Sequence, residues 1–211
     1  MKILGISGSG RKDRMIHGAI KKIISQLDFE SEVISLLGQS INGCTGCTLC
    51  AGDNICKQKD DWNAIGEKMR QADLIIFGAP NYYGTINALG HACLERTFSF
   101  RHLGNFSLKD KLAVSISTTR NRNGEDPVKK IIQRFMHSNQ MEVIGHVTVK
   151  GYNQCYTCGY GIDCAIGNVV KDHGYLEEVK PKHYPLDLEE QEESLEQIDR
   201  IIETIQRRIE T

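Results

Sequence analysis

Short apolar runs alternate with amphipathic stretches along most of the chain. Runs rich in β-branched and other apolar residues predict strands at 2–7, 32–36, 74–78, 112–117 and 143–149. Elsewhere apolar residues recur at three- and four-residue spacing, which predicts helices at 15–27, 62–71, 87–100, 128–137 and 187–210. Strands and helices that alternate in this way predict an α/β fold: a doubly wound, five-stranded parallel sheet in a single domain, 1–211.

Two long irregular segments interrupt this alternation. One is a cysteine loop at 42–60, after the second predicted strand, and the other is a cysteine-rich insertion at 151–185, before the last helix. Irregular segments of this length within a compact domain are usually functional or disordered. Because both contain clustered cysteines, we expect them to be functional.

Composition narrows the class of protein. A net charge of −1 gives no reason to expect nucleic acid or an anionic membrane surface as a partner. No apolar run approaches the ~20 residues of a membrane span, and the first residues form a predicted strand rather than a signal peptide. We therefore expect a cytoplasmic protein, in which the eight cysteines serve as metal ligands or redox groups rather than as disulfides.

Three polar loops follow predicted strands, at the edge where open α/β sheets bind their ligands. The first loop places small residues, hydroxyls and positive charge before a helix N-terminus, which suits a phosphate group. Because it lacks the spacing of a Walker A or dinucleotide motif, we favour a phosphomonoester as its ligand. The second combines aromatic rings with an amide side chain, which suits a flat heterocycle. The candidate cofactor-binding residues of the three loops are Ser7, Ser9, Arg11, Lys12, Pro80, Asn81, Tyr82, Tyr83, Gly84, Ser117, Thr118, Thr119, Arg120, Asn121 and Gly124.

The strongest chemical signal is a compact cysteine motif, Cys44-x2-Cys47-x2-Cys50-x5-Cys56. Thiolates at this spacing can wrap around one cubane, and iron–sulfur clusters are commonly held by four cysteines in such runs. Zinc sites more often use two separated Cys-x2-Cys pairs. The motif favours a [4Fe–4S] cluster, with zinc or a loop of free thiols as the alternatives.

Together, the motif and the loops resemble the iron–sulfur flavoproteins, which belong to the wider NAD(P)H-dependent FMN reductase group. The similarity runs from Ile3 to about Gly145. It includes Ser-Gly-Ser-x-Arg-Lys at 7–12, Pro-x-Tyr-x-Gly at 80–84, Leu-x-Arg at 94–96 and Arg-Asn at 120–121. The resemblance implies a flavodoxin-like fold, FMN on the three loops and a [4Fe–4S] cluster on the cysteine loop. It also implies a homodimer or homotetramer that passes electrons between cluster and flavin.

One part of the phosphate loop departs from the family pattern. Met15 and Ile16 stand where the family usually has a small polar pair that helps to bind the FMN phosphate. We expect the positive charges of Arg11, Lys12 and Arg14 to compensate.

A second cysteine group, Cys155-x2-Cys158-x5-Cys164, repeats the spacing of the last three cysteines of the first motif. Three thiolates leave a tetrahedral site incomplete, so a fourth ligand is expected from His173, Cys93, solvent or another subunit. We predict a second metal site, with zinc or iron–sulfur as the metal and free thiols as the alternative.

These features predict an FMN- and cluster-dependent oxidoreductase, with a ferredoxin-type carrier or NAD(P)H as the candidate electron partner. One alternative is an electron carrier or redox sensor without a substrate of its own. The other is an FMN or quinone reductase in which the thiols bind zinc or are structural. We see no Ser-His-Asp or paired-carboxylate arrangement in the sequence, so no residue is assigned a catalytic role.

Overall fold

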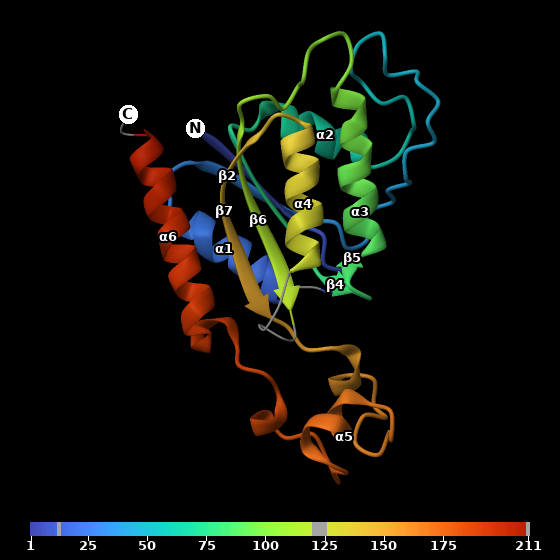
Figure 1. The fold of residues 1–211 in the computed structure, drawn as a ribbon, viewed down its shortest axis with the longest axis vertical. Coiled ribbons are helices and arrows are strands. Elements are labelled where there is room, and N and C mark those ends of the chain that lie inside the picture. The colour runs from blue at the N-terminus through green and yellow to red at the C-terminus, as the bar shows by residue number, and fades with distance from the viewer. Residues whose placement is uncertain (12–13, 120–125, 210–211) are drawn as a thin grey trace.

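A computed structural model describes residues 1–11, 14–119 and 126–209. At its centre is a five-stranded sheet in the order β2-β1-β3-β6-β7, in which every neighbouring pair is parallel (Figure 1). The strands are β1 (Lys2–Ser7), β2 (Glu30–Ser35), β3 (Leu74–Ala79), β6 (Leu112–Thr119) and β7 (Glu142–Lys150). The predicted α/β fold with a five-stranded parallel sheet is confirmed.

Helices cover both faces of the sheet, and each face has its own apolar core. One core lies under α1 (Met15–Ser25) and α6 (Glu192–Ile209). The other lies under α2 (Trp62–Gln71), α3 (Ala88–Glu95) and α4 (Pro127–Ser138). The central strand β3 is buried along its whole length, because it is covered on both faces. This explains why its sequence is a continuous apolar run.

Glycine lets α1 lie directly on the sheet. A Cβ at Gly5 of β1 would come within 2.3 Å of Ile20 Cγ2 in α1. Since β1 leads into α1 through residues 8–14, this close contact holds the N-terminus of α1 at the carboxyl edge of the sheet. The first polar loop therefore lies at the edge where the sequence predicted it.

Three regions differ in kind from the predicted elements. The helix expected at 87–100 divides into α3 and a 3-10 helix, η1 (Arg96–Phe100). Residues 80–86 contain a small hairpin, β4 (Asn81–Tyr82) and β5 (Thr85–Ile86), which was not predicted. The helix expected at 187–210 begins as a 3-10 turn, η4 (Leu188–Glu190), and becomes α-helical only at Glu192.

The interruption before α6 has a tertiary cause. The side chain of Gln191 is buried and pairs with the backbone of β7: Lys150 N donates to Gln191 Oε1 at 2.7 Å, and Gln191 Nε2 donates to Lys150 O at 3.0 Å. These bonds hold Gln191 at φ −96° and ψ 78°, outside the helical region. Local periodicity cannot reveal such a contact.

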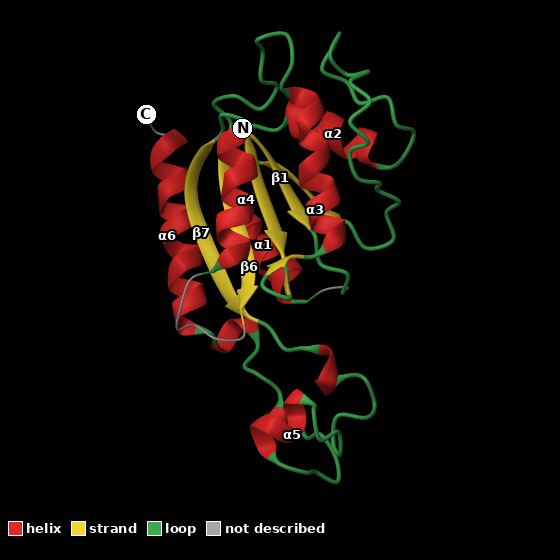
Figure 2. Cartoon of the chain, turned by 45° about the vertical axis from the view of Figure 1, so that its right-hand side comes forward, coloured by secondary structure: helices red, strands yellow, loops and turns green. Residues whose placement is uncertain are grey.

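The insertion at 151–185 forms a lobe that projects beyond the carboxyl edge of the sheet (Figures 1 and 2). It contains a short helix, α5 (Asn168–His173), and two 3-10 turns, η2 (Gln154–Tyr156) and η3 (Pro181–His183). We call this segment the 151–185 lobe. Within the described residues, no helix is long and apolar enough to cross a membrane.

Candidate functional site

A cleft of about 400 Å³ opens at the carboxyl edge of the sheet, between the three polar loops and the 151–185 lobe. Its size falls within the range of about 300–1,000 Å³ that is usual for small-molecule sites. The lining residues are Ser9, Arg11, Arg14, Met15, Ile16, Pro80, Asn81, Tyr82, Thr118, Thr119, Gly151, Tyr152, Asn153, Gln154 and Asn168. The fold thus brings together residues that are up to 159 positions apart in the sequence.

Most of the predicted loop residues that the structure describes border this cleft, but four lie elsewhere. Ser7 and Ser117 are buried at strand ends, while Tyr83 and Gly84 form the exposed turn of the β4–β5 hairpin, both with positive φ. The predicted residues Lys12, Arg120, Asn121 and Gly124 fall outside the described residues.

The first loop concentrates positive charge beside the N-terminus of α1. The guanidinium groups of Arg11 and Arg14 lie 5.5 and 5.4 Å from the centre of the Tyr152 ring. Arg11 Nη1 also donates to Tyr152 O at 2.9 Å, which fixes this side chain at the cleft wall. Ser9 Oγ accepts from Arg11 N at 3.1 Å and shapes the turn. Together with the positive end of the helix dipole, these groups favour an anion.

Hydrogen bonds tie the second loop to its neighbours. Asn81 N donates to Thr118 Oγ1 at 3.2 Å, which joins the second loop to the third. The buried Asn87 Nδ2 donates to Gly8 O at 2.7 Å, which joins the start of α3 to the first loop. The three loops therefore form one connected wall rather than three independent turns.

A buried polar network lies where the third loop leaves β6 and enters α4. Ser117 Oγ donates to Asp126 Oδ2, and His146 Nε2 lies 3.2 Å from Ser117 Oγ. Burial raises the pKa of Asp126, but hydrogen bonds from His146, Ser117 and the Lys129 N–H outweigh it and bring the pKa to about 2. Burial lowers the pKa of His146. The predicted binding residue Ser117 thus has a structural partner, and the side chains of Asp126 and His146 were not identified from the sequence.

This network does contain serine, histidine and aspartate, the residue types of a hydrolytic triad. However, the Ser117 side chain is fully buried, so its oxygen is not open to a substrate. Asp126 instead caps α4, because its side chain accepts from Lys129 N at 3.0 Å. The arrangement is a loop anchor.

The second candidate site is a small cavity of about 30 Å³ beside the C-terminal end of α3. All four cysteines of the first motif line it, together with Arg96 and neighbouring residues. Cys50 is buried, Cys56 is half-buried, and Cys44 and Cys47 are exposed. Within the described residues, no three His, Cys, Asp or Glu side chains converge closely enough to form a ready metal site.

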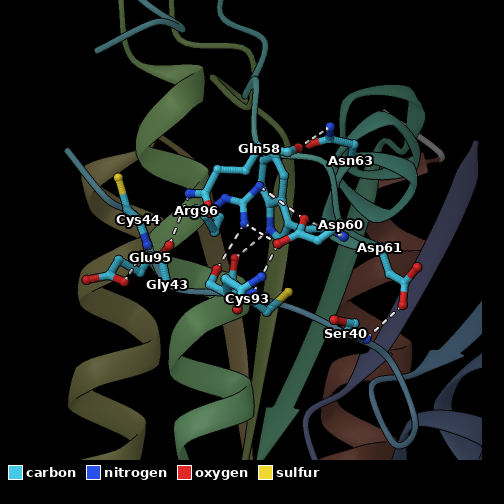
Figure 3. Close-up of polar contacts among 12 residues, drawn as sticks. Ser40, Gly43, Cys44, Gln58, Asp60, Asp61, Asn63, Cys93, Glu95 and Arg96 are labelled. Carbon is cyan, nitrogen blue, oxygen red and sulfur yellow. Dashed lines mark hydrogen bonds and ion pairs between the residues drawn. The ribbon is translucent and has the colours of Figure 1, made fainter. Parts of the chain in front are cut away.

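A buried ion pair anchors the cysteine loop (Figure 3). Arg96 Nη1 lies 2.6 Å from Asp60 Oδ2 and donates to Asn42 O at 2.9 Å. The Arg96 and Asp60 side chains are only 0% and 2% exposed. Asp60 Oδ2 also accepts from Asn42 N at 3.0 Å, so one carboxylate joins both ends of the loop. Burial raises the pKa of Asp60, but the Arg96 and Asn42 hydrogen bonds outweigh it and hold that pKa below its usual range.

The electrostatics of the four thiols differ. Burial raises the pKa of Cys50, and the nearby thiols Cys56, Cys47 and Cys44 raise it further. The pKa of Cys47 is lowered, chiefly by a hydrogen bond from the Leu49 backbone N–H. Four thiols around one cavity therefore repel one another when ionised, as ligand sets do before a cation neutralises them.

The second cysteine group lies in the 151–185 lobe, away from the first. Of the four candidate sources of its fourth ligand, Cys93 is excluded, because that side chain is fully buried in the core under α3, where burial raises its pKa to about 12. His173 lies in the same lobe as the three cysteines. Its Nε2 is 3.0 Å from Tyr156 Oη.

Comparison with known proteins assigns the family. Residues 1–154 match the NADPH-dependent FMN reductase family. The chain is 36% identical over 149 residues to an iron–sulfur flavoprotein of Methanosarcina thermophila, covering 69% of this chain and 78% of that protein. It is 34% identical over 151 residues to an iron–sulfur flavoprotein of Methanocaldococcus jannaschii, covering 69% of this chain and 76% of that protein.

Solved structures with low sequence identity share the fold. RosB superposes with a TM-score of 0.57 at 20% identity, covering 76% of this chain and 70% of that one. FerB, an NAD(P)H:(acceptor) oxidoreductase of Paracoccus denitrificans, superposes with a TM-score of 0.52 at 14% identity. The superposition covers 98% of this chain and 97% of FerB. By its sequence relatives and its family match, the chain is an FMN-dependent oxidoreductase that belongs to the NADPH-dependent FMN reductase family and, within it, to the iron–sulfur flavoproteins.

Proposed function

We propose that this oxidoreductase holds FMN in the 400 Å³ cleft and a [4Fe–4S] cluster in the cysteine loop, and passes electrons between them. The observation that supports the cluster is the common cavity lined by Cys44, Cys47, Cys50 and Cys56. Bound FMN would exchange electrons singly or in pairs, and a bound cluster would exchange one at a time.

The cleft residues fit FMN by charge and by shape. Arg11, Arg14 and the N-terminus of α1 offer positive charge and N–H groups for a phosphate. The side chains of Asn81 and Tyr82 border the same cleft and suit a flat, polar ring system. Met15 and Ile16 offer no polar side chain in this part of the wall. We therefore propose the two arginines as the main phosphate ligands.

The cysteine loop fits a cluster by its donor set and by one orphaned donor. Four closely spaced thiols are the usual ligands of a [4Fe–4S] cluster. Arg96, which lines the same cavity, has a buried Nε that bonds to no other group of the described residues. Hydrogen-bond donors facing cluster sulfurs tune such centres. Zinc is the second candidate for these thiols.

The two candidate sites lie toward opposite ends of α3. Asn87, just before this helix, donates to Gly8 O in the first polar loop. Glu95, the last residue of the helix, accepts from Cys44 N at 2.9 Å. Eight helical residues span about 12 Å. One rigid helix therefore sets the separation between the cleft and the cysteine cavity within a chain.

We further propose that the chain forms a homodimer or homotetramer and exchanges electrons with a ferredoxin-type carrier or NAD(P)H. Four large apolar side chains near the cysteine cavity are exposed, which supports an association surface there. They are Leu49, Ile55, Phe98 and Leu103, which are 65%, 41%, 49% and 69% exposed.

The test is the cofactor content of the full chain purified without oxygen. Changing each of Cys44, Cys47, Cys50 and Cys56 singly to alanine should remove iron and sulfide while FMN is retained, because the cleft shares no lining residue with the cysteine cavity. Cys93→Ala is the matched control and should keep both the iron–sulfur content and the FMN. Full iron and sulfide in all four variants would refute the ligand set, and zinc in place of iron would favour the second candidate.

Turnover separates an enzyme from an electron carrier. The holoprotein should oxidise NADPH or NADH in the presence of an artificial acceptor. Reduction by a ferredoxin without any pyridine-nucleotide oxidation would instead assign a carrier role.

A further inference from the structure

The 151–185 lobe buries few apolar side chains of its own. It stands apart from the layered body of the molecule (Figures 1 and 2), and within its 35 positions only Tyr156 and Val169 are apolar side chains that are buried. Segments this small usually need a disulfide or a metal ion to fix their fold. All three of its cysteines are free thiols, so the structure offers no disulfide to do this.

The turn at the first two cysteines has a shape that suits metal binding. Gly159, directly after Cys158, has a φ of +85°, which turns the backbone back toward the preceding thiol. As a result Tyr160 N lies 3.4 Å from Cys158 Sγ and donates to it. Backbone N–H groups beside sulfur are typical of the outer shells of metal sites.

Two further glycines bring the rest of the lobe against these cysteines. A Cβ at Gly161 would lie 2.0 Å from Cys155 O, and a Cβ at Gly167 would lie 3.3 Å from Cys164 Sγ. Any larger residue at position 161 would push the chain away from Cys155. Three thiolates with one nitrogen or oxygen ligand suit a single zinc ion, whereas a four-iron cluster is usually held by four thiolates.

We propose that the thiolates of Cys155, Cys158 and Cys164 bind one zinc-class ion that stabilises the 151–185 lobe. Zinc accepts three thiolates together with one nitrogen or oxygen ligand, and His173 is the candidate within the lobe. The sulfurs do not face a common point among the described residues, so binding requires side-chain rotation. Cys158 is exposed and the other two are half-buried, which leaves room for it.

This ion would act on the flavin cleft through the lobe. Tyr152, Asn153, Gln154 and Asn168 all border the cleft, and they flank the cysteines in the sequence. The bond from Arg11 to Tyr152 O ties that wall to the phosphate loop. A metal that orders the lobe would therefore order one side of the cleft.

The test measures zinc, iron and sulfide per chain in full-length protein whose Cys44, Cys47, Cys50 and Cys56 are changed to serine, which removes the other thiol site. This parent should carry about one zinc per chain, and adding Cys155→Ser, Cys158→Ser and Cys164→Ser should remove it. Equal zinc in the two proteins, no zinc in either, or iron and sulfide in place of zinc would overturn the proposal. Far-UV circular dichroism and FMN binding check that both chains fold.

A second measurement uses the unmutated chain, so that it does not depend on the folding of a variant. Iodoacetamide labelling followed by mass spectrometry should show the three lobe thiols protected in zinc-supplemented protein and labelled after chelation. Trypsin should then cut faster after Lys171 and Lys182, which are exposed lobe residues that no proline follows. Buried Cys93 is the internal control and should stay unlabelled throughout. Equal labelling of the lobe thiols with and without zinc would refute the site.

Discussion

Replacing Asp60 with alanine should strongly destabilise the protein at the base of the cysteine loop. The change leaves the Arg96 guanidinium buried, with its side chain 0% exposed and its carboxylate partner gone. Arg96 would lose contacts of 2.6 and 3.2 Å to the two carboxylate oxygens and keep its bond to Asn42 O. Asp60 also accepts from Trp62 N at 3.2 Å, so the first turn of α2 loses a bond as well.

The magnitude follows from the burial of the pair. Removing one partner of a buried ion pair costs about 3–5 kcal/mol, because the remaining charge stays in a low-dielectric environment. Natural domains have only about 5–15 kcal/mol of total stability. In a chain of this size each kcal/mol lowers Tm by about 2–4 °C. We therefore expect Tm to fall by roughly 6–20 °C.

Trp62 provides the assay. It is the single tryptophan of the chain, it is buried, and its ring lies 5.0 Å from the Arg96 guanidinium. Urea unfolding followed by Trp62 fluorescence reports on the loop anchor, and far-UV circular dichroism reports on the whole fold. If both probes shift together, the loss is global; if fluorescence shifts first, the loop anchor opens locally.

The matched control is Asp61→Ala. It removes the same charge one residue away, from a side chain that lies on the surface and accepts one hydrogen bond, from Ser40 N. It should cost about 1 kcal/mol or less. If Asp60→Ala and Asp61→Ala had the same midpoint by both probes, the argument that the buried pair anchors the loop would be wrong.

Three further predictions concern the cleft and the assembly. The Ser9→Ala/Arg11→Ala double variant should bind FMN at least tenfold more weakly, measured by fluorescence titration, because a charge-assisted phosphate contact is worth about 1.5–3 kcal/mol; unchanged affinity would remove the phosphate-loop assignment. The pKa of Asp126 is depressed to about 2, so its contribution to stability is complete above its unfolded value and is lost as pH falls toward 2. Asp126→Asn should therefore lower the urea midpoint at pH 7 and flatten the dependence of this midpoint on acidic pH. An unchanged dependence on acidic pH would contradict the network with His146. Light scattering at micromolar concentration should give the mass of a dimer or tetramer, and a sharp monomer mass would exclude the proposed association.

The sequence by itself determined the layered α/β fold, because periodicity is a local property. The apolar run of β3 and the helical stripe of α1 are both visible without knowledge of their partners. The first cysteine motif is equally local, since its four thiols fall within 13 consecutive positions and must share a loop. The polar loops could be placed at one edge because parallel strands end on the same side of a sheet.

Only the tertiary structure decided how these parts meet. The pairing of Arg96 with Asp60 joins η1 to the end of the cysteine loop, 36 positions earlier in the chain. The 151–185 lobe supplies Tyr152 to the cleft proposed for FMN, 141 positions from its partner Arg11. Gln191 delays the start of the last α-helix to Glu192 because β7 offers it two backbone bonds. These outcomes depend on burial and on contacts between distant segments, which spacing along the chain does not encode.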